Sequence, residues 1–194
     1  MSDKPTRLRQ ISFCLLAVAV LIGGTRLLGS AYHHYLTGVY PIAFADQVEA
    51  AADEFGLDPY LIYAVIHTES DFNPDALSSA DAKGLMQLTD DTYRWAVKRE
   101  NAGKDADPQD LFDPAVNIRY GVYVLTLLGE QFQNTDTVLA AYNAGQGRVR
   151  EWLADPAYST DGITLRTIPY PETEDYIRRV NETCDRYRRL YDKQ

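Results

Sequence analysis

The stretch YAVIHTESDFNPDALSSADAKGLMQL, residues 63 to 88, places one carboxylic acid, Glu69, near the end of an apolar helix. Asp58-Pro59 predicts the start of that helix, because aspartate accepts hydrogen bonds from free backbone N–H groups and proline fits the first turn. Asn73-Pro74 predicts its end, because the residue before a proline is disfavoured in the helical region. We therefore expect Glu69 to close a short helix and a polar loop to follow it.

Glu69 continues the apolar stripe of this helix. Val65 and Ile66 lie four and three residues before it, so the three side chains share one face. A buried, unpaired carboxylate is costly, and a raised pKa that keeps it protonated near neutral pH lowers that cost. The pattern predicts a general acid at Glu69, and the alternative is an ordinary acidic residue near a helix end.

The composition limits the possible functions. The 194 residues are 45% hydrophobic, enough for one sizeable core and an appendage. The formal net charge of −9 argues against nucleic acid as a partner, because phosphate binding requires a concentrated basic face. Cys14 and Cys184 are far apart and the three histidines show no metal spacing. We therefore predict neither a disulfide nor a metal site.

The N-terminal region predicts export. Three basic residues precede the charge-free run 11–24, and residues 11–31 reach the length of a membrane span if Arg26 lies near the outer end. Basic residues before the run favour an N-terminus in the cytoplasm and a domain outside it. A cleaved signal peptide is the alternative, although the small-residue pattern for cleavage is poor. The expected segments are a cytoplasmic N-terminus at 1–10, a transmembrane anchor or signal segment at 11–31, a linker at 32–43 and one domain at 44–194.

The domain is expected to be mainly α. Apolar residues recur at spacings of three and four through most of it, and Asp113-Pro114 repeats the helix-start signal of Asp58-Pro59. Residues 78–88 are rich in small and polar side chains and pass through Gly84 into residues 85–88, which alternate enough for a short strand. This pattern predicts a small β-hairpin insert. Asn117 is a polar residue within an apolar helix, and we interpret it as a structural hydrogen-bonding residue.

Four short stretches occur in order along this domain. They are Glu69-Ser70, Gly84-Leu85-Met86-Gln87, Ala140-Ala141-Tyr142-Asn143-Ala144-Gly145, and Glu172-Thr173 with Tyr176. In that order they resemble the signature stretches of the soluble lytic transglycosylase family, over about residues 44–191. The resemblance implies a lysozyme-like α+β fold. It also implies cleavage of bacterial peptidoglycan at the β-1,4 bond between N-acetylmuramic acid and N-acetylglucosamine, with formation of a 1,6-anhydro sugar.

The resemblance implies a role for each matching residue and no metal or cofactor. Glu69 matches the single catalytic acid and base. The implied substrate-binding residues are Ser70, Met86, Gln87, Tyr142, Asn143 and Tyr176. The Tyr142 phenol is expected to orient the acid, and the Asn143 amide to hold an N-acetyl group. Core packing is the alternative for Met86 and Tyr176, and a hydroxyl that satisfies a backbone carbonyl is the alternative for Ser70.

One acid suffices for this chemistry, because the C6 hydroxyl of the muramic acid is the nucleophile and Glu69 acts first as acid and then as base. A hydrolase needs a second carboxylate. The candidates by position are Asp81, whose alternative is a turn residue, and Asp90, whose alternative is a helix cap. Competing functions are a hydrolytic muramidase resembling goose-type lysozyme and an inactive peptidoglycan-binding module. We expect a monomer at the cell membrane, with its domain facing the cell wall and peptidoglycan strands as its partner.

Overall fold

The structure is a computed structural model of the chain, and it describes residues 4–100, 103 and 105–192. The chain divides into two units, Met1–Pro41 and Ile42–Gln194. The first unit contains one long helix, and the second contains the domain with the candidate site.

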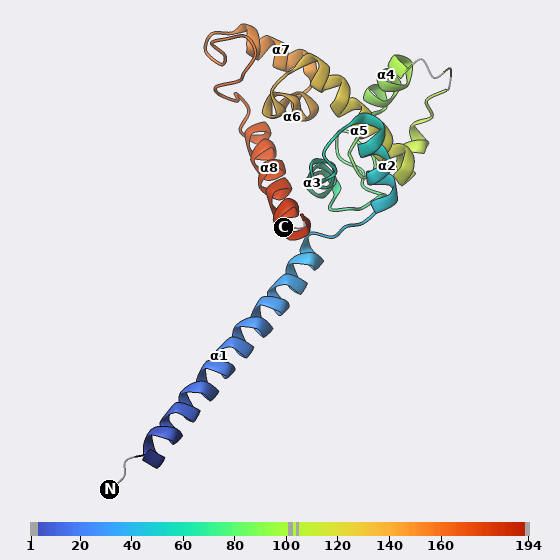
Figure 1. Ribbon diagram of the computed structural model, residues 1–194. Helices are drawn as coiled ribbons and strands as arrows, with labels where there is room; N and C mark the ends of the chain where they lie inside the picture. The colour runs from blue at the N-terminus through green and yellow to red at the C-terminus, as the bar shows by residue number, and fades with distance from the viewer. Residues whose placement is uncertain (1–3, 101–102, 104, 193–194) are drawn as a thin grey trace. The chain divides into compact units, whose positions relative to one another are not determined.

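The helix of the first unit, α1 (Lys4–Val39), is continuous over 36 residues (Figure 1). It runs through the predicted span 11–31 and through most of the predicted linker 32–43, so the linker is largely helical. Residues 1–3 of the predicted cytoplasmic segment lie outside the described residues. Among the helices described in this chain, none combines the length and the apolar character required to cross a membrane. Attachment to the membrane through residues 11–31 stays a prediction.

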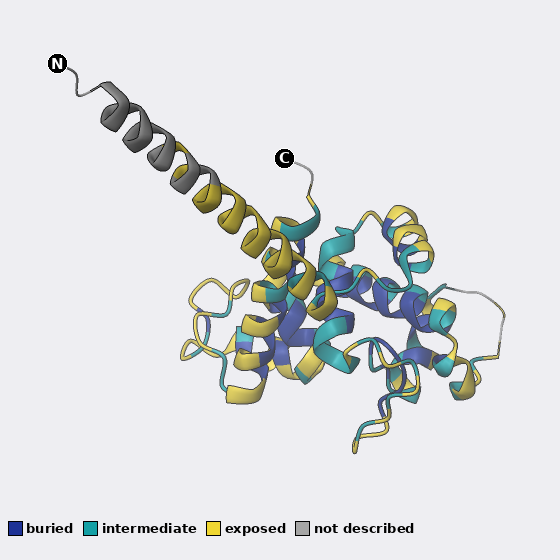
Figure 2. Ribbon diagram, turned by 90° about the horizontal axis from the view of Figure 1, so that it is seen from below, coloured by how far each residue is buried: buried dark blue, intermediate teal, exposed yellow. Residues whose placement is uncertain are grey.

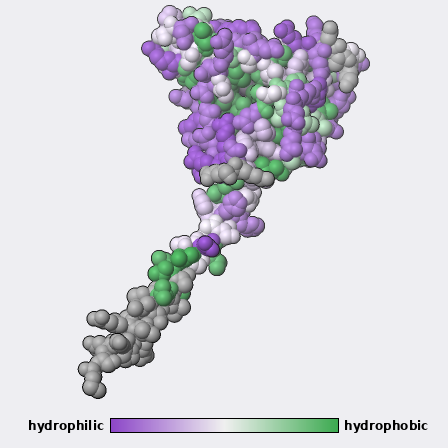
Figure 3. All heavy atoms as spheres, in the orientation of Figure 1, coloured by the Kyte–Doolittle hydropathy of each residue, from purple (hydrophilic) through white to green (hydrophobic). Residues whose placement is uncertain are grey.

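The second unit is built from helices around a central one, α5. The elements are α2 (Ala45–Phe55), α3 (Pro59–Ser70), α4 (Asp90–Glu100), the 3-10 helix η1 (Pro108–Phe112), α5 (Pro114–Gln131), α6 (Thr135–Ala144), α7 (Gln146–Ala154) and α8 (Pro171–Tyr191). Helix α5 packs against α2, α4, α6 and η1, and α8 packs against α3 and α6. Buried residues gather inside this unit (Figure 2), and hydrophilic side chains cover most of the face seen in Figure 3. The prediction of a mainly α domain is confirmed.

Both predicted helix starts are confirmed, with the expected chemistry. The Asp58 carboxylate accepts from the Tyr60 backbone N–H at 2.9 Å, at the start of α3. The Asp113 carboxylate accepts from two backbone N–H groups at the start of α5. Helix α3 ends at Ser70, because Asp71 adopts a left-handed conformation, φ 49°. This end comes before the predicted stop at Asn73-Pro74 and leaves Glu69 in the last turn.

The predicted β-hairpin at 78–88 is wrong. Two isolated antiparallel bridges, Leu77 with Lys83 and Lys83 with Leu88, replace it, and the described residues contain no strand. The reason is the backbone: Asp81, Gly84 and Gln87 have φ values of 62°, 72° and 49°. Each positive φ turns the chain, so the extended run that a strand requires never forms.

Asn117 on α5 holds this loop in place, which confirms its interpretation as a structural residue. Its amide nitrogen donates to the carbonyl oxygens of Lys83 and Leu111 at 2.9 and 2.8 Å, and its amide oxygen accepts from Met86 N at 2.7 Å. Gly84 lies so close that a Cβ there would come within 2.3 Å of the Asn117 amide nitrogen. The buried amide therefore fixes the loop backbone that forms one wall of the site.

Candidate active site

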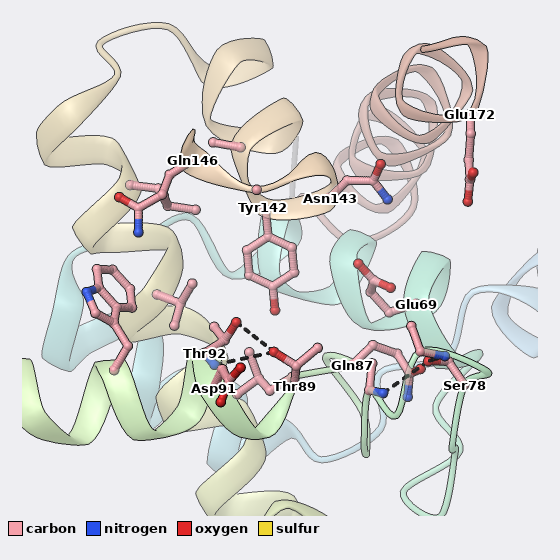
Figure 4. Close-up of a pocket in the computed structure, with 18 of the residues that line it drawn as sticks. Glu69, Ser78, Gln87, Thr89, Asp91, Thr92, Tyr142, Asn143, Gln146 and Glu172 are labelled. Atoms are coloured by element: carbon pink, nitrogen blue, oxygen red, sulfur yellow. Dashed lines mark hydrogen bonds between the residues drawn. The ribbon is translucent and has the colours of Figure 1, made fainter. Parts of the chain in front are cut away.

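A cavity of about 560 Å³ lies between the loop after α3 and the helices α4 to α8 (Figure 4). Helices α3 to α8 and the loop between α3 and α4 all contribute to its lining. The polar residues among those that line it are Glu69, Ser78, Ser79, Gln87, Thr89, Asp91, Thr92, Trp95, Tyr142, Asn143, Gln146 and Glu172. The structure thus brings Glu69, Gln87, Tyr142 and Asn143 from the sequence prediction together at one cavity.

Glu69 lies half-buried in the last turn of α3, with its carboxylate toward the cavity in Figure 4. Burial raises its pKa from 4.5 to about 7, and Tyr176 and the charge of Arg179 oppose this shift. Within the described part of the chain, Glu69 forms no ion pair closer than 4 Å. The direction of the pKa shift is the one that the sequence predicted, and its cause is the predicted one, desolvation.

Two tyrosines lie close to Glu69. The Tyr142 hydroxyl donates to the Met86 carbonyl oxygen at 2.8 Å. The sequence predicted that this phenol orients Glu69, whereas in the structure its proton is donated to the loop. The Tyr176 hydroxyl has no hydrogen-bond partner of good geometry among the described residues, yet it lies near enough to Glu69 to lower its pKa. Burial, and then the charge of Glu69, raises the pKa of both phenols well above 10. Both tyrosines are therefore neutral neighbours of the acid.

Three predicted binding residues do not line the cavity. Ser70 donates to the carbonyl oxygens of Leu85 and Ile66 at 2.8 and 3.2 Å, so its hydroxyl fastens the loop to α3. Met86 is 0% exposed and packs on α5 where Gly121 leaves room, and Tyr176 is 2% exposed beside Glu69. The alternatives to direct substrate binding, a satisfied backbone carbonyl and core packing, describe these three residues in the structure.

Gln87 and Asn143 do line the cavity, and neighbouring groups hold both side chains. The Gln87 amide nitrogen donates to the Gly84 and Ala76 carbonyl oxygens at 2.9 and 3.2 Å. The Asn143 amide oxygen accepts from the Thr173 hydroxyl at 2.8 Å. Each side chain therefore has one end fixed and one end available to the cavity.

The two residues considered as second acids belong to another cluster. Asp81 and Asp90 pair with Lys83 at 2.9 and 2.7 Å, and neither lines the cavity. Thr89, not Asp90, caps α4, because its hydroxyl accepts from Thr92 N at 3.3 Å. Among the described residues, no group of three or more histidine, cysteine or acidic side chains is arranged to hold a metal ion.

Sequence reasoning missed several lining residues. Asp91, Thr92 and Trp95 lie on the cavity side of α4, and Gln146 and Glu172 lie in the first turns of α7 and α8. Their signal was weak: Trp95 lay within an apolar helical pattern, and only Glu172 belonged to a recognised stretch. The spacing of three and four between Asp91, Thr92 and Trp95 would have placed them on one face, but not which face.

Chemically, the cavity offers one acid, Glu69, whose pKa of about 7 makes both its protonated and its charged form accessible near neutral pH. Neutral hydroxyl and amide groups and two further acidic side chains, Asp91 and Glu172, share the lining. Such an acid can donate a proton to an ether oxygen and then, as a carboxylate, accept another. The amides of Gln87 and Asn143 and the hydroxyls of Ser78 and Thr89 suit a neutral ligand that is rich in hydroxyl and carbonyl groups.

A family model and the sequences of known proteins point to the same family. The model of the transglycosylase SLT domain matches residues 46–161. The chain is 34% identical to a soluble lytic murein transglycosylase of Escherichia coli over 143 residues, which is 73% of this chain and 22% of the relative. It is 35% identical to a membrane-bound lytic murein transglycosylase C of Edwardsiella ictaluri over 170 residues, which is 76% of this chain and 47% of that relative. The chain therefore matches less than half the length of either relative.

Solved structures agree. An inactive mutant of the lytic transglycosylase Slt from Pseudomonas aeruginosa matches with a TM-score of 0.70 and 35% identity, over 82% of this chain and 26% of that one. A 70-kDa soluble lytic transglycosylase in complex with bulgecin A matches with a TM-score of 0.72 and 30% identity, again over 82% and 26%. On its fold, its motifs and its relatives, the chain belongs to the family of the transglycosylase SLT domain.

Proposed function

We propose that this domain is a peptidoglycan lytic transglycosylase that cleaves the β-1,4 bond between N-acetylmuramic acid and N-acetylglucosamine. The observation that carries the proposal is Glu69, a cavity-lining acid whose pKa burial raises to about 7. Support also comes from relatives named lytic murein transglycosylases, with which the chain shares more than 30% identity.

The chemistry follows from one acid acting twice. Protonated Glu69 gives its proton to the bridging oxygen, and the bond from that oxygen to C1 of the muramic acid breaks. The N-acetylglucosamine leaves with a free 4-hydroxyl. The Glu69 carboxylate then takes the proton from the C6 hydroxyl of the muramic acid, whose oxygen bonds to C1 and forms the 1,6-anhydro ring. Glu69 ends protonated again, and no water is consumed.

The surrounding residues suit this cycle. Burial keeps Tyr142 neutral, so no phenolate competes with Glu69 for the first proton. Desolvation favours the protonated acid at the start, and the charge of Arg179 makes the carboxylate of the second step less costly. A pKa of about 7 suits a group that must give and accept a proton in the same cycle.

The mass of the released muropeptides tests the proposal. Purified peptidoglycan is digested with the wild-type domain, with Glu69→Gln as the matched control. We expect products lighter by one water than hydrolysed muropeptides, and none from the control. Reducing-end muramic acid as the main product would favour a hydrolytic muramidase, in which Asp91, the cavity carboxylate on α4, is the first candidate for activating water. Binding without cleavage would favour the peptidoglycan-binding module.

We also propose that the domain works outside the cytoplasm, attached to the membrane by the segment at 11–31 and facing the cell wall. The basic residues before the charge-free run 11–24 support this location, and so does a relative named as membrane-bound. Membrane fractionation combined with N-terminal sequencing is the test. A soluble exported protein that begins after Thr25 or Ser30 would favour a cleaved signal peptide.

A further inference from the structure

A buried hydroxyl on α8 contacts a cavity residue on α6. Thr173 is 2% exposed in the first turn of α8, and its Oγ1 donates to Oδ1 of Asn143 at 2.8 Å. Asn143 lines the cavity near the end of α6, thirty residues earlier in the chain. The contact therefore joins the helix that ends at the cavity to the helix that begins beside it.

The direction of this hydrogen bond follows from the position of Thr173. A threonine hydroxyl in the middle of a helix usually donates to the carbonyl four residues earlier, but α8 begins at Pro171 and offers no helical carbonyl there. Among the described residues, Asn143 Oδ1 is the acceptor that the structure provides. The Thr173 proton therefore selects the amide oxygen of Asn143, since the amide nitrogen is a donor only.

The selected orientation leaves the amide nitrogen for the cavity. In Figure 4 the Asn143 nitrogen lies on the side of Glu69, and the oxygen points away from it. In the part of the chain that the structure describes, that nitrogen donates to no other group. Two N–H donors are therefore free for a ligand, and a flipped amide would present an acceptor in their place.

We propose that Thr173 is a positioning residue, which holds the Asn143 amide with its N–H groups toward the cavity so that they donate to a carbonyl oxygen of the ligand. This inference rests on the proposed function, because the N-acetyl groups of peptidoglycan provide that oxygen. With the amide flipped, the Asn143 amide oxygen would face the carbonyl oxygen of the ligand, with no proton between the two. The Thr173 hydroxyl therefore sets the preference for N-acetylated sugars without touching them.

The test measures binding, so that it does not depend on cleavage. The probe is a tetramer of N-acetylglucosamine, titrated calorimetrically into the full chain that carries Glu69→Gln, and the comparison probe is the corresponding glucosamine tetramer. Thr173→Val keeps the β-branched shape and removes the hydroxyl. We expect it to weaken binding of the acetylated probe roughly 2- to 12-fold, the range of one net hydrogen bond. The glucosamine tetramer has no acetyl carbonyl group. Its binding should therefore change by less than about twofold, below the smallest loss expected for the acetylated probe.

A double-mutant cycle separates positioning from a structural role. In an Asn143→Ala background, Thr173→Val should cause no further loss, because the group that it orients is gone. Thr173→Ser, which keeps a hydroxyl, should restore most of the affinity. An equal loss in both Asn143 backgrounds, or an equal loss with both probes, would overturn the proposal. If Thr173→Val does not fold, as judged by thermal unfolding, Thr173→Ala serves in the same cycle.

Failure of the proposed cleavage activity and failure of the positioning role of Thr173 give different results. If the wild-type chain releases no muropeptides but the cycle shows coupling with the acetylated probe, the positioning of Asn143 stands and the cleavage activity falls. If the wild-type chain cleaves peptidoglycan and the cycle shows no coupling, the positioning role falls alone. Absence of binding by the Glu69→Gln chain to the acetylated probe would overturn the positioning role as well, since no N-acetyl group would be held.

Discussion

Two acidic sites adjoin the same loop, and they differ in their surroundings. Glu69 faces the cavity, forms no ion pair within the described chain, and has a pKa raised to about 7 by burial. Asp81 and Asp90 pair with the Lys83 ammonium, whose side chain is 7% exposed. The difference teaches that surroundings, not residue type, decide whether a carboxyl group is ion-paired or stays unpaired at the cavity.

The Lys83 cluster serves the fold. Hydrogen bonds from Lys83 to Asp90 and then to Asp81 raise the pKa of the ammonium, so the buried cation keeps its charge and its partners. The pair with Asp90 joins the loop to the first residue of α4. Lys83 and Asn117 therefore hold the loop that forms one wall of the cavity, together with Ser70.

The largest expected effect is a loss of peptidoglycan cleavage when Glu69 is substituted. Glu69→Gln keeps the side-chain volume and removes the proton donor, so cleavage of purified peptidoglycan should fall about 100- to 10,000-fold. The far-UV circular dichroism spectrum should remain that of the wild type, because the substitution leaves the packing in place. A Glu69→Gln chain that clears cell walls at nearly the wild-type rate would remove Glu69 from the mechanism.

The second effect concerns stability and pH. Because the pKa of Glu69 is about 7 in the folded chain and ordinarily 4.5, the folded state binds this proton more tightly. The stabilisation of the folded state by this proton is complete below about pH 4.5 and is lost as pH rises through about 7. Between pH 4 and pH 8 the wild type should lose on the order of 1 to 3 kcal/mol relative to Glu69→Gln, by urea unfolding.

The control for this experiment is Glu172→Gln, which removes the same charge from an exposed cavity residue. This variant keeps Glu69, so its stability should fall between pH 4 and pH 8 as that of the wild type does. A wild-type chain whose stability relative to Glu69→Gln does not change over this range would show that burial does not raise the Glu69 pKa.

A smaller effect is expected at the Lys83 cluster. Asp90→Asn removes one of the two carboxylates that hold Lys83, so we expect a loss of about 1 to 2 kcal/mol in the free energy of unfolding. Activity should stay within about threefold of the wild type, because the cavity lining excludes Asp90. Asp91→Asn, at the exposed neighbouring position, is the stability control. A folded but inactive Asp90→Asn chain would assign Asp90 to the mechanism.

The smallest expected effect tests how much the charge of Arg179 contributes to the Glu69 pKa. The charge of Arg179 lowers that pKa, so Arg179→Gln should raise it and shift the alkaline limb of the activity profile to higher pH. Arg178→Gln removes the same charge one residue earlier on α8, from a side chain that pairs with Asp175 and Glu182, and should leave the limb in place. A shift of the limb to lower pH in Arg179→Gln would contradict this electrostatic account.

Local chemistry explains why much of the fold could be predicted from the sequence. The starts of α3 and α5 depend on an aspartate and a proline that are adjacent in sequence, and the face of Glu69 depends on a helical spacing of three and four. The hairpin was wrong because alternation of side chains does not report φ, and three positive φ values break the strand. Membrane attachment through 11–31 stays a prediction that fractionation must test.

The sequence by itself determined most helices of the domain, the helix face of Glu69 and the motifs, because these depend on residues within one or two turns of each other. Only the tertiary structure decided which polar groups meet. In the fold, Asp81 and Asp90 form ion pairs with Lys83. Tyr142 donates a hydrogen bond to Met86, and Thr173 donates one to Asn143. Such pairings join residues up to 56 positions apart, and the packing of helices around α5 sets them. A periodic pattern shows which face a side chain occupies, whereas its partner depends on what the fold brings to that face.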